Sequence, residues 1–119
     1  MQTGFPLKNK KIWVAGHRGM VGAATVRRLG SEGCEILTVS REACDLRDSA
    51  AVEGWMVQNR PDVVILAAAR VGGIVANAKY PADFIYDNMM IAANVIHAAH
   101  RHDVAKLLYL GSSCIYPRE

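Results

Sequence analysis

Four short, almost wholly apolar runs alternate along the chain with three longer segments in which apolar residues recur at helical spacing. The runs are IWVAG (12–16), EILTV (35–39), DVVILAA (62–68) and AKLLYLG (105–111). Runs without polar alternation are typical of strands buried on both faces of a parallel sheet. The pattern therefore predicts the order β-α-β-α-β-α-β, with helices on both faces of the sheet and right-handed crossovers.

The three helices are expected over residues 20–32, 48–59 and 80–101. In the second, Asp48 or Ser49 is the expected N-cap, since a short polar side chain there accepts from free backbone N–H groups. The third is expected to bury Ile85, Met89, Ala92, Ile96 and Ala99 and to expose Asp83, Asp87, Asn94, His97 and Arg101. This assignment of the buried face rests on the recurrence of apolar residues at helical spacing.

The predicted fold is a Rossmann-type, doubly wound α/β sheet with the strand order 3-2-1-4. In that order the first and fourth strands are neighbours, and ligands bind at the carboxyl ends of the strands between them. The loops GHRGMVG (16–22) and GSSCIYP (111–117) are then expected to face one crevice. Neither length nor composition suggests a linker, so residues 1–119 are expected to form one NAD(P)-binding domain.

The loop GHRGMVG places three glycines between a predicted strand and a predicted helix. Gly16 permits a tight turn, Gly19 lets the backbone approach a pyrophosphate, and Gly22 packs the helix against the sheet. The N-terminus of that helix then offers N–H groups and a positive dipole end to phosphate. In its strand-turn-helix context the motif predicts a dinucleotide site rather than a plain glycine turn.

The residues after the second strand favour NADP over NAD. NAD enzymes usually place an acidic residue there, about 20 residues beyond the glycines. This chain has Arg41, with Arg18 in the glycine loop, and two guanidiniums suit a 2′-phosphate. Glu42 is the contrary observation, and Arg41 could instead be a solvated loop residue. Asp45 and Leu46 either line an adenine pocket or, for Asp45, cap the second helix.

Composition and charge exclude several classes of function. The net charge of +3 comes from scattered basic residues, which suits an anionic ligand and gives no nucleic-acid footprint. Three cysteines without a CxxC pair predict neither a zinc site nor a disulfide framework, and favour a reducing compartment. The longest apolar run is far too short to span a bilayer. We therefore expect a soluble, cytoplasmic protein that binds neither membrane nor nucleic acid.

No metal site is expected. His97, His100 and His102 lie near the end of the third helix at spacings that do not bring all three to one face. Histidines in a last helical turn more often interact with the helix dipole or solvent.

The segment after the fourth run carries candidate chemistry. The Ser112 hydroxyl could hydrogen-bond a substrate oxygen during hydride transfer, and the Cys114 thiol could act as an acid or base. Nucleophilic catalysis would need His17 as its base, and no third residue to orient that histidine is apparent. The structural alternative is a serine-rich turn that ends at Pro117.

Four stretches together resemble one enzyme family: VAGHRGMVG, AAARVGGIVAN, YPADFIYDNMMIAANVIHAAH and LGSSCIYP. They are similar to the GDP-L-fucose synthases, which are extended short-chain dehydrogenase/reductases. The resemblance implies an NADPH-dependent 3,5-epimerase-4-reductase that acts on GDP-4-keto-6-deoxy-D-mannose. It also implies a homodimer for the full-length protein.

The resemblance implies roles for individual residues. Cofactor-binding positions would be Gly16, Arg18, Gly19, Met20, Val21, Gly22, Arg41, Asp45, Leu46, Leu66, Ala67, Ala68 and Ala69. Among these, the glycines would hold the pyrophosphate and the arginines the 2′-phosphate. Ser112 would bind the C4 oxygen of the substrate, and Cys114 would act as a base in the epimerisation.

One departure from the family pattern is large. The Tyr-x-x-x-Lys pair that completes the reductase set is absent, since Phe84, Met90 and Ser113 follow the three tyrosines that have a residue at that spacing. We therefore expect a chain truncated at its C-terminus, without the substrate domain and inactive alone. Two alternatives stay open: another NAD(P)-dependent nucleotide-sugar epimerase or dehydratase, and a non-catalytic NADP-binding module.

Overall fold

The computed structural model describes residues 4–68, 79 and 81–110. Its elements are β1 (Lys11–Ala15), α1 (Met20–Leu29), β2 (Glu35–Leu37), α2 (Ser49–Asn59), β3 (Val63–Leu66), α4 (Pro81–Arg101) and β4 (Lys106–Tyr109). The predicted alternation of strands and helices is confirmed. Asp48 is the N-cap of α2, since its carboxylate accepts from the backbone N–H groups of Ala50 and Ala51.

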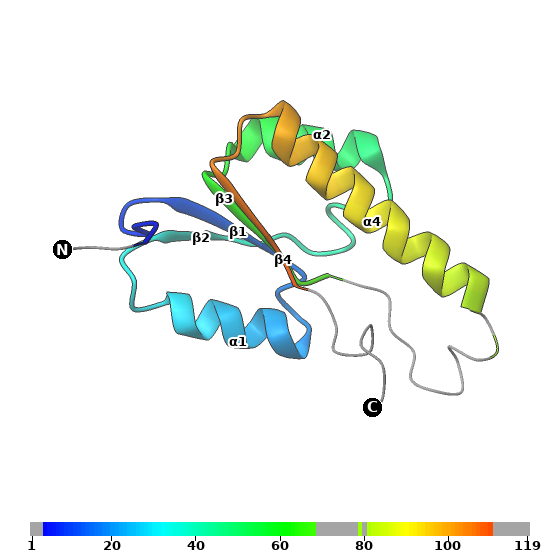
Figure 1. The fold of residues 1–119 in the computed structure, drawn as a ribbon, viewed down its shortest axis with the longest axis horizontal. Coiled ribbons are helices and arrows are strands. Elements are labelled where there is room, and N and C mark those ends of the chain that lie inside the picture. Colours follow the sequence, from blue (N-terminus) through cyan, green and yellow to red (C-terminus); the bar gives the residue numbers. More distant parts are fainter. Residues whose placement is uncertain (1–3, 69–78, 80, 111–119) are drawn as a thin grey trace.

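All strand pairs are parallel, but the order predicted for them is wrong. The sheet runs β2-β1-β3-β4 rather than 3-2-1-4, so β3 and not β4 is the second neighbour of β1. In the register, Ile12 lies opposite both Ile36 and Val63, and Val63 lies opposite Lys106. Figure 1 shows the strands side by side, with α2 and α4 on one face of the sheet and α1 on the other.

The segment after β2 folds into turns, in which the N–H groups of Ala43 and Cys44 both donate to the Ser40 carbonyl. Helix α2 then lies on the face of the sheet opposite α1, and β3 pairs with β1. All four residues of β3 are buried, as a central strand requires.

This order changes which loops face one another. The loop after β1 now faces Ala67 and Ala68, which follow β3, and the Ala67 N–H donates to the Ala15 carbonyl over 2.8 Å. The predicted meeting of 16–22 with 111–117 rested on adjacent first and fourth strands, and β3 separates them. Residues 111–117 lie outside the described part of the chain.

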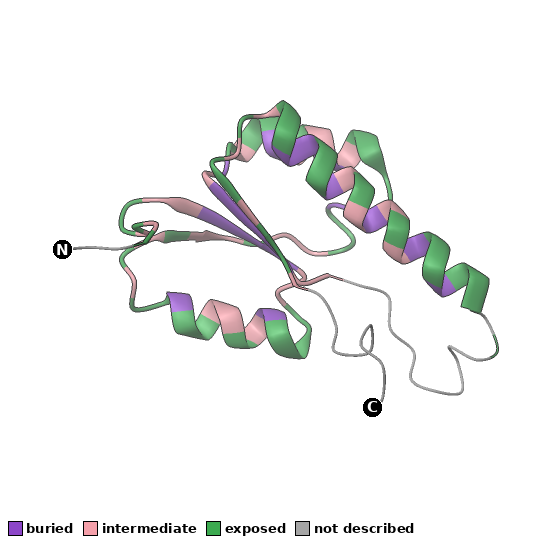
Figure 2. Ribbon diagram, viewed as in Figure 1, coloured by how far each residue is buried: buried purple, intermediate pink, exposed green. Residues whose placement is uncertain are grey.

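The central strands divide their side chains between two hydrophobic layers. Trp13 and Val64 point into the layer formed by α2 and α4, while Ile12 and Val63 join the layer under α1. Because successive strand residues point to opposite faces, an unbroken apolar run fills both layers. Figure 2 shows this burial along the strands and along the faces of α2 and α4 that meet the sheet.

Helix α4 is rotated relative to the sequence-based prediction. Its buried residues are Phe84, Asp87, Ile91, Val95, Ala98 and Ala99. Ile85 and Met89, which were expected to be buried, are 59% and 66% exposed. The helix is apolar around much of its circumference, so helical spacing alone fits two neighbouring stripes. The expected exposure of Asp87 is likewise wrong.

No helix among the described residues is long and apolar enough to cross a membrane. The longest described helix is α4, with 21 residues.

An ionic cluster joins α2 to the C-terminal end of α4. The Glu53 carboxylate accepts from the Arg101 guanidinium over 2.7 Å, and its second oxygen contacts the ring Nε2 of His102. The hydrogen bond with His102, followed by the charge of Arg101, lowers the pKa of Glu53. A carboxyl with a lowered folded-state pKa stabilises the fold above its unfolded pKa, and this contribution is lost as pH falls through the folded pKa.

We expect Glu53→Gln to destabilise the protein at pH 7, because the uncharged amide loses the ion pair with Arg101. The difference from the wild type should shrink as pH falls from about 5 to about 3, where the wild-type carboxylate is itself protonated. Urea unfolding followed by tryptophan fluorescence at several pH values measures this. Glu32→Gln, which removes the partner of the exposed Arg28, is the control and should cost less. A difference that stays constant with pH would contradict the assignment.

Candidate functional site

The turn after β1 brings three backbone segments into close contact. Gly16 has φ of +95°, a left-handed conformation that favours glycine. A Cβ on Gly16 would lie 2.6 Å from the Ala68 Cα, and a Cβ on Gly22 only 1.9 Å from the Gly16 carbonyl oxygen. These contacts fix the N-terminus of α1 against the carboxyl ends of β1 and β3.

The N-terminus of α1 has no side-chain cap. Its N-cap, Gly19, is extended, and the first turn contains no acidic residue. By contrast, α2 has the Asp48 carboxylate on its first N–H groups. A Cβ on Gly19 would meet only the Gly16 carbonyl oxygen, at 3.7 Å, so space is open there. Uncapped N–H groups and open space suit an anionic group such as phosphate.

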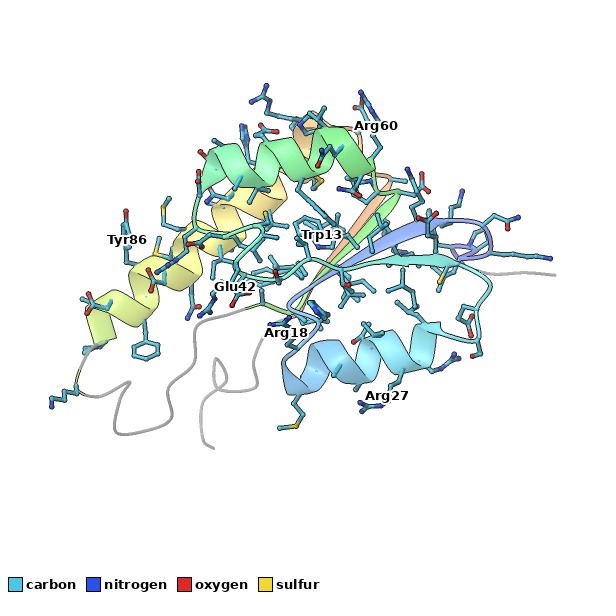
Figure 3. The ribbon with its side chains drawn as sticks, turned by 180° about the vertical axis from the view of Figure 1, so that it is seen from behind. Trp13, Arg18, Arg27, Glu42, Arg60 and Tyr86 are labelled. Carbon is cyan, nitrogen blue, oxygen red and sulfur yellow. The ribbon has the colours of Figure 1, made fainter. Side chains whose placement is uncertain are left out.

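One cavity of about 630 Å³ lies at this end of the sheet. Eight of the predicted cofactor-binding residues line it: Gly16, Arg18, Gly19, Arg41, Asp45, Leu46, Ala67 and Ala68. They come from the turn after β1, the loop after β2 and the first residues after β3. Figure 3 shows Arg18 and Glu42 near one another at this end, with Trp13 beneath α2 and Arg27 pointing outward from α1.

The other predicted cofactor-binding residues that the structure describes do not line this cavity. Met20 and Val21 are 88% and 55% exposed on α1, whereas Leu66 is buried within β3. Gly22 is covered by the turn itself. Ala69, Ser112 and Cys114 lie outside the described residues.

The mouth of the cavity carries paired charges. Arg18 and Glu42 lie 4.0 Å apart, and both side chains are largely exposed. The pKa of Glu42 is lowered, first by a hydrogen bond to its own backbone and further by the charges of Arg18 and Arg41. The carboxylate therefore stays ionised and competes for the arginines with any other anion at the mouth.

Asp45 is held by Arg47 and does not cap α2. The guanidinium donates to both carboxylate oxygens, over 3.1 Å and 3.0 Å, and the Arg47 backbone N–H donates over 3.0 Å. These hydrogen bonds lower the pKa of Asp45. Of the two alternatives for Asp45, the structure excludes the cap, since Asp48 occupies that position.

Cys44, beside Asp45, is a packing residue. It is 5% exposed and belongs to the core cluster under α2 and α4. Burial raises the pKa of its thiol, and the charges of Asp45 and Asp48 add to the effect. The thiol therefore stays protonated and is a poor nucleophile.

Several lining residues were not assigned to a site from the sequence. They are Trp13, Val39, Arg47, Asp87 and Ile91. Trp13 and Val39 read as ordinary strand residues, and Asp87 and Ile91 required the correct face of α4. Arg47 alone offered a sequence indication, since it follows Asp45 and Leu46 directly.

Within the described ranges, no group of three or more histidine, cysteine or acidic side chains could hold a metal ion.

The fold is that of a Rossmann-type α/β domain, with one parallel sheet between helices. The family model described as the NAD dependent epimerase/dehydratase family matches residues 12–119. The chain therefore belongs to this family.

Similar proteins narrow the comparison. The chain is 54% identical over 114 residues to the GDP-L-fucose synthase of Sinorhizobium fredii, covering 96% of this chain and 36% of that protein. It is 56% identical over 113 residues to the Escherichia coli GDP-L-fucose synthase, covering 94% and 35%. The chain thus spans about a third of the length of these relatives.

A solved structure has the same arrangement of elements. The GDP-mannoheptose C4 reductase MlghC from Campylobacter jejuni, with NADP bound, superposes with a TM-score of 0.85 at 39% identity. The match covers 92% of this chain and 35% of that one.

We expect Gly22→Ala to prevent stable folding or to cost about 3 kcal/mol or more, because the added methyl would overlap a backbone carbonyl that cannot move alone. Gly19→Ala is the matched control three residues earlier, where the methyl has room, and it should keep near wild-type stability. Urea unfolding of both variants measures the difference. Equal stability of the two variants would contradict the packing described for this turn.

Proposed function

We propose that this chain is the cofactor-binding part of a GDP-L-fucose synthase, an NADPH-dependent enzyme that epimerises and reduces GDP-4-keto-6-deoxy-D-mannose. The observation that carries the proposal is a cavity lined by Gly19, the N-cap of α1, together with Arg18 and Arg41. The identity of 54–56% to GDP-L-fucose synthases supports the substrate class. Residues 1–119 would then form one dinucleotide-binding domain.

The cavity residues fit a bound dinucleotide in three places. The pyrophosphate would lie at the uncapped N-terminus of α1, where Gly19 leaves room. Arg18 and Arg41 would hold the 2′-phosphate by charge-assisted hydrogen bonds. Leu46 and Asp45 would line the adenine end. When bound, NADPH supplies the hydride, and these residues hold and orient it.

NADP(H) is the proposed cofactor because both arginines line the cavity at the carboxyl ends of the strands, where sheets of this type bind dinucleotides. A related reductase is described with NADP bound, which supports the assignment. Glu42 counts against it, but its carboxylate is paired with Arg18 at the cavity mouth.

Catalytic roles for Ser112 and Cys114 stay predictions, since both lie outside the described residues. We propose that Ser112 binds the substrate C4 oxygen and that Cys114 acts as a base in the epimerisation. Homodimer formation, a cytoplasmic location and the absence of a metal stay predictions as well.

A GDP-sugar C4 reductase without epimerase activity is the second candidate. The similarity to GDP-mannoheptose C4 reductase favours it. The two candidates share the cofactor site and the GDP-sugar, and they differ in whether a base exchanges the C3 and C5 protons of the substrate. Solvent deuterium incorporation by the full-length enzyme would separate them.

We expect Arg41→Ala to weaken NADPH binding by about 10-fold or more while changing NADH binding little, since a charge-assisted phosphate contact is lost. Glu42→Gln should change the NADPH affinity in the opposite direction and strengthen binding, because it removes a carboxylate that competes for the arginines. Quenching of the fluorescence of Trp13, which lines the cavity, measures both.

Arg27→Ala is the matched control, because Arg27 is exposed on α1 and points away from the cavity. Tighter binding of NADH than NADPH by the wild type would contradict the assignment of the arginines.

We also expect the 119-residue chain to show no turnover of GDP-4-keto-6-deoxy-D-mannose, because it contains no Tyr-x-x-x-Lys pair to protonate the reduced oxygen. NADPH oxidation and product formation, assayed beside the Escherichia coli enzyme as a positive control, test this. Measurable turnover by this chain alone would refute it.

A further inference from the structure

The loop after β2 is held against α4 by two separate contacts. The Asn94 side-chain amide donates to the Leu46 carbonyl over 2.9 Å. One residue further on, the Arg47 guanidinium lies 3.5 Å from the Asp87 carboxylate. Both contacts join segments at least 40 residues apart in the sequence. They place the loop and α4 on adjoining walls of the cavity.

Arg47 binds two carboxylates at once. Its Nε and Nη2 atoms donate to Asp45, while Nη1 faces Asp87. All three residues line the cavity. A planar guanidinium can join two carboxylates in this way, whereas the compact ammonium of a lysine cannot reproduce its fork of donors.

Burial of Asp87 makes this bridge important. The Asp87 side chain is only 10% exposed, and its partner Arg47 is 48% exposed. A partly buried carboxylate needs a compensating charge or hydrogen bonds. Without Arg47, the cavity wall would keep the negative charges of Asp45 and Asp87 but lose the cation that contacts both, and this would disfavour an anionic ligand.

We propose that Arg47 is a positioning residue that ties the Asp45–Leu46 loop to α4 through Asp87 and so preforms the adenine end of the dinucleotide cavity. In this role Arg47 does not bind a phosphate of the ligand: its Nε and Nη2 atoms donate to Asp45, and Nη1 faces Asp87. The inference rests on the proposed dinucleotide binding and extends it to a residue pair outside the glycine loop and the 2′-phosphate site.

The test compares Arg47→Met, Arg47→Lys and Asp87→Asn with the wild-type chain. The ligands are NADPH, NADH and 2′,5′-ADP, all of which carry adenine. We expect Arg47→Met to weaken all three about 10-fold, since the wall that contacts adenine is common to them. Arg47→Lys should bind the three ligands little better than Arg47→Met, because the bridge between the two carboxylates is required and the charge alone is not enough. Asp87→Asn should weaken all three ligands several-fold.

The double variant Arg47→Met/Asp87→Asn should bind no more weakly than Arg47→Met alone, because both changes break one bridge. Arg27→Met, on the exposed side of α1, is the matched control and should change nothing. Near-ultraviolet circular dichroism and thermal unfolding show that each variant is folded. If Arg47→Met fails to fold, the comparison of Arg47→Lys with Asp87→Asn decides.

Two results would overturn the inference while leaving the proposed function intact. Wild-type affinity in Arg47→Lys and Asp87→Asn would show that the bridge does not matter. A loss confined to NADPH and 2′,5′-ADP in Arg47→Met, with tighter binding in Asp87→Asn, would show that Arg47 contacts the 2′-phosphate directly. Failure of the wild type to bind any of the three ligands would instead overturn the proposed function, and the inference with it.

Discussion

The carboxyl end of β1 is where three backbone segments meet without room for a side chain. The turn at Gly16 lies against Ala68 on one side and against Gly22 of α1 on the other. Because glycine alone fits at both positions, the N-terminus of α1 is set over the ends of β1 and β3. The N-cap of α1, Gly19, therefore borders the cavity together with the turn at Gly16.

The opposite wall depends on how α4 is rotated. Phe84, Ile91 and Val95 face inward, and this orientation carries Asp87 to the cavity as well. A carboxylate on the buried side of a helix is unfavourable without a partner. Arg47 is such a partner, so the packing of α4 and the position of the loop after β2 depend on each other.

The charges around the cavity divide into two regions. Near the glycine turn, Arg18 and Arg41 both act on the Glu42 carboxylate. At the loop after β2, Arg47 is already paired with Asp45 and Asp87. The first region is thus suited to an added anion, and the second to an uncharged group such as a purine ring. A dinucleotide with a 2′-phosphate contains both an anionic group and a purine ring.

The sequence by itself determined the elements, the parallel sheet and the glycine turn. These are local features: largely apolar runs, a capping residue at Asp48, and the spacing of Gly16, Gly19 and Gly22. Local features can be recognised in the sequence without knowledge of the fold. It also placed Arg18, Arg41, Asp45 and Leu46 on one site, since loops at the carboxyl ends of parallel strands share an edge. The strand order was less accessible, because four apolar runs do not say where the chain crosses the sheet.

Only the tertiary structure decided which stripe of α4 is buried, and with it the place of Asp87. Helix α4 offers two apolar stripes of similar length, and periodicity cannot choose between them. The choice comes from contacts with distant segments, since Ile91, Val95, Ala98 and Ala99 pack in one core cluster with residues of β1, α2 and β3. The contacts of Arg47 with Asp87 and of Asn94 with Leu46 agree with this orientation. Burial and ion pairing are properties of neighbours in space, and the sequence shows only neighbours along the chain.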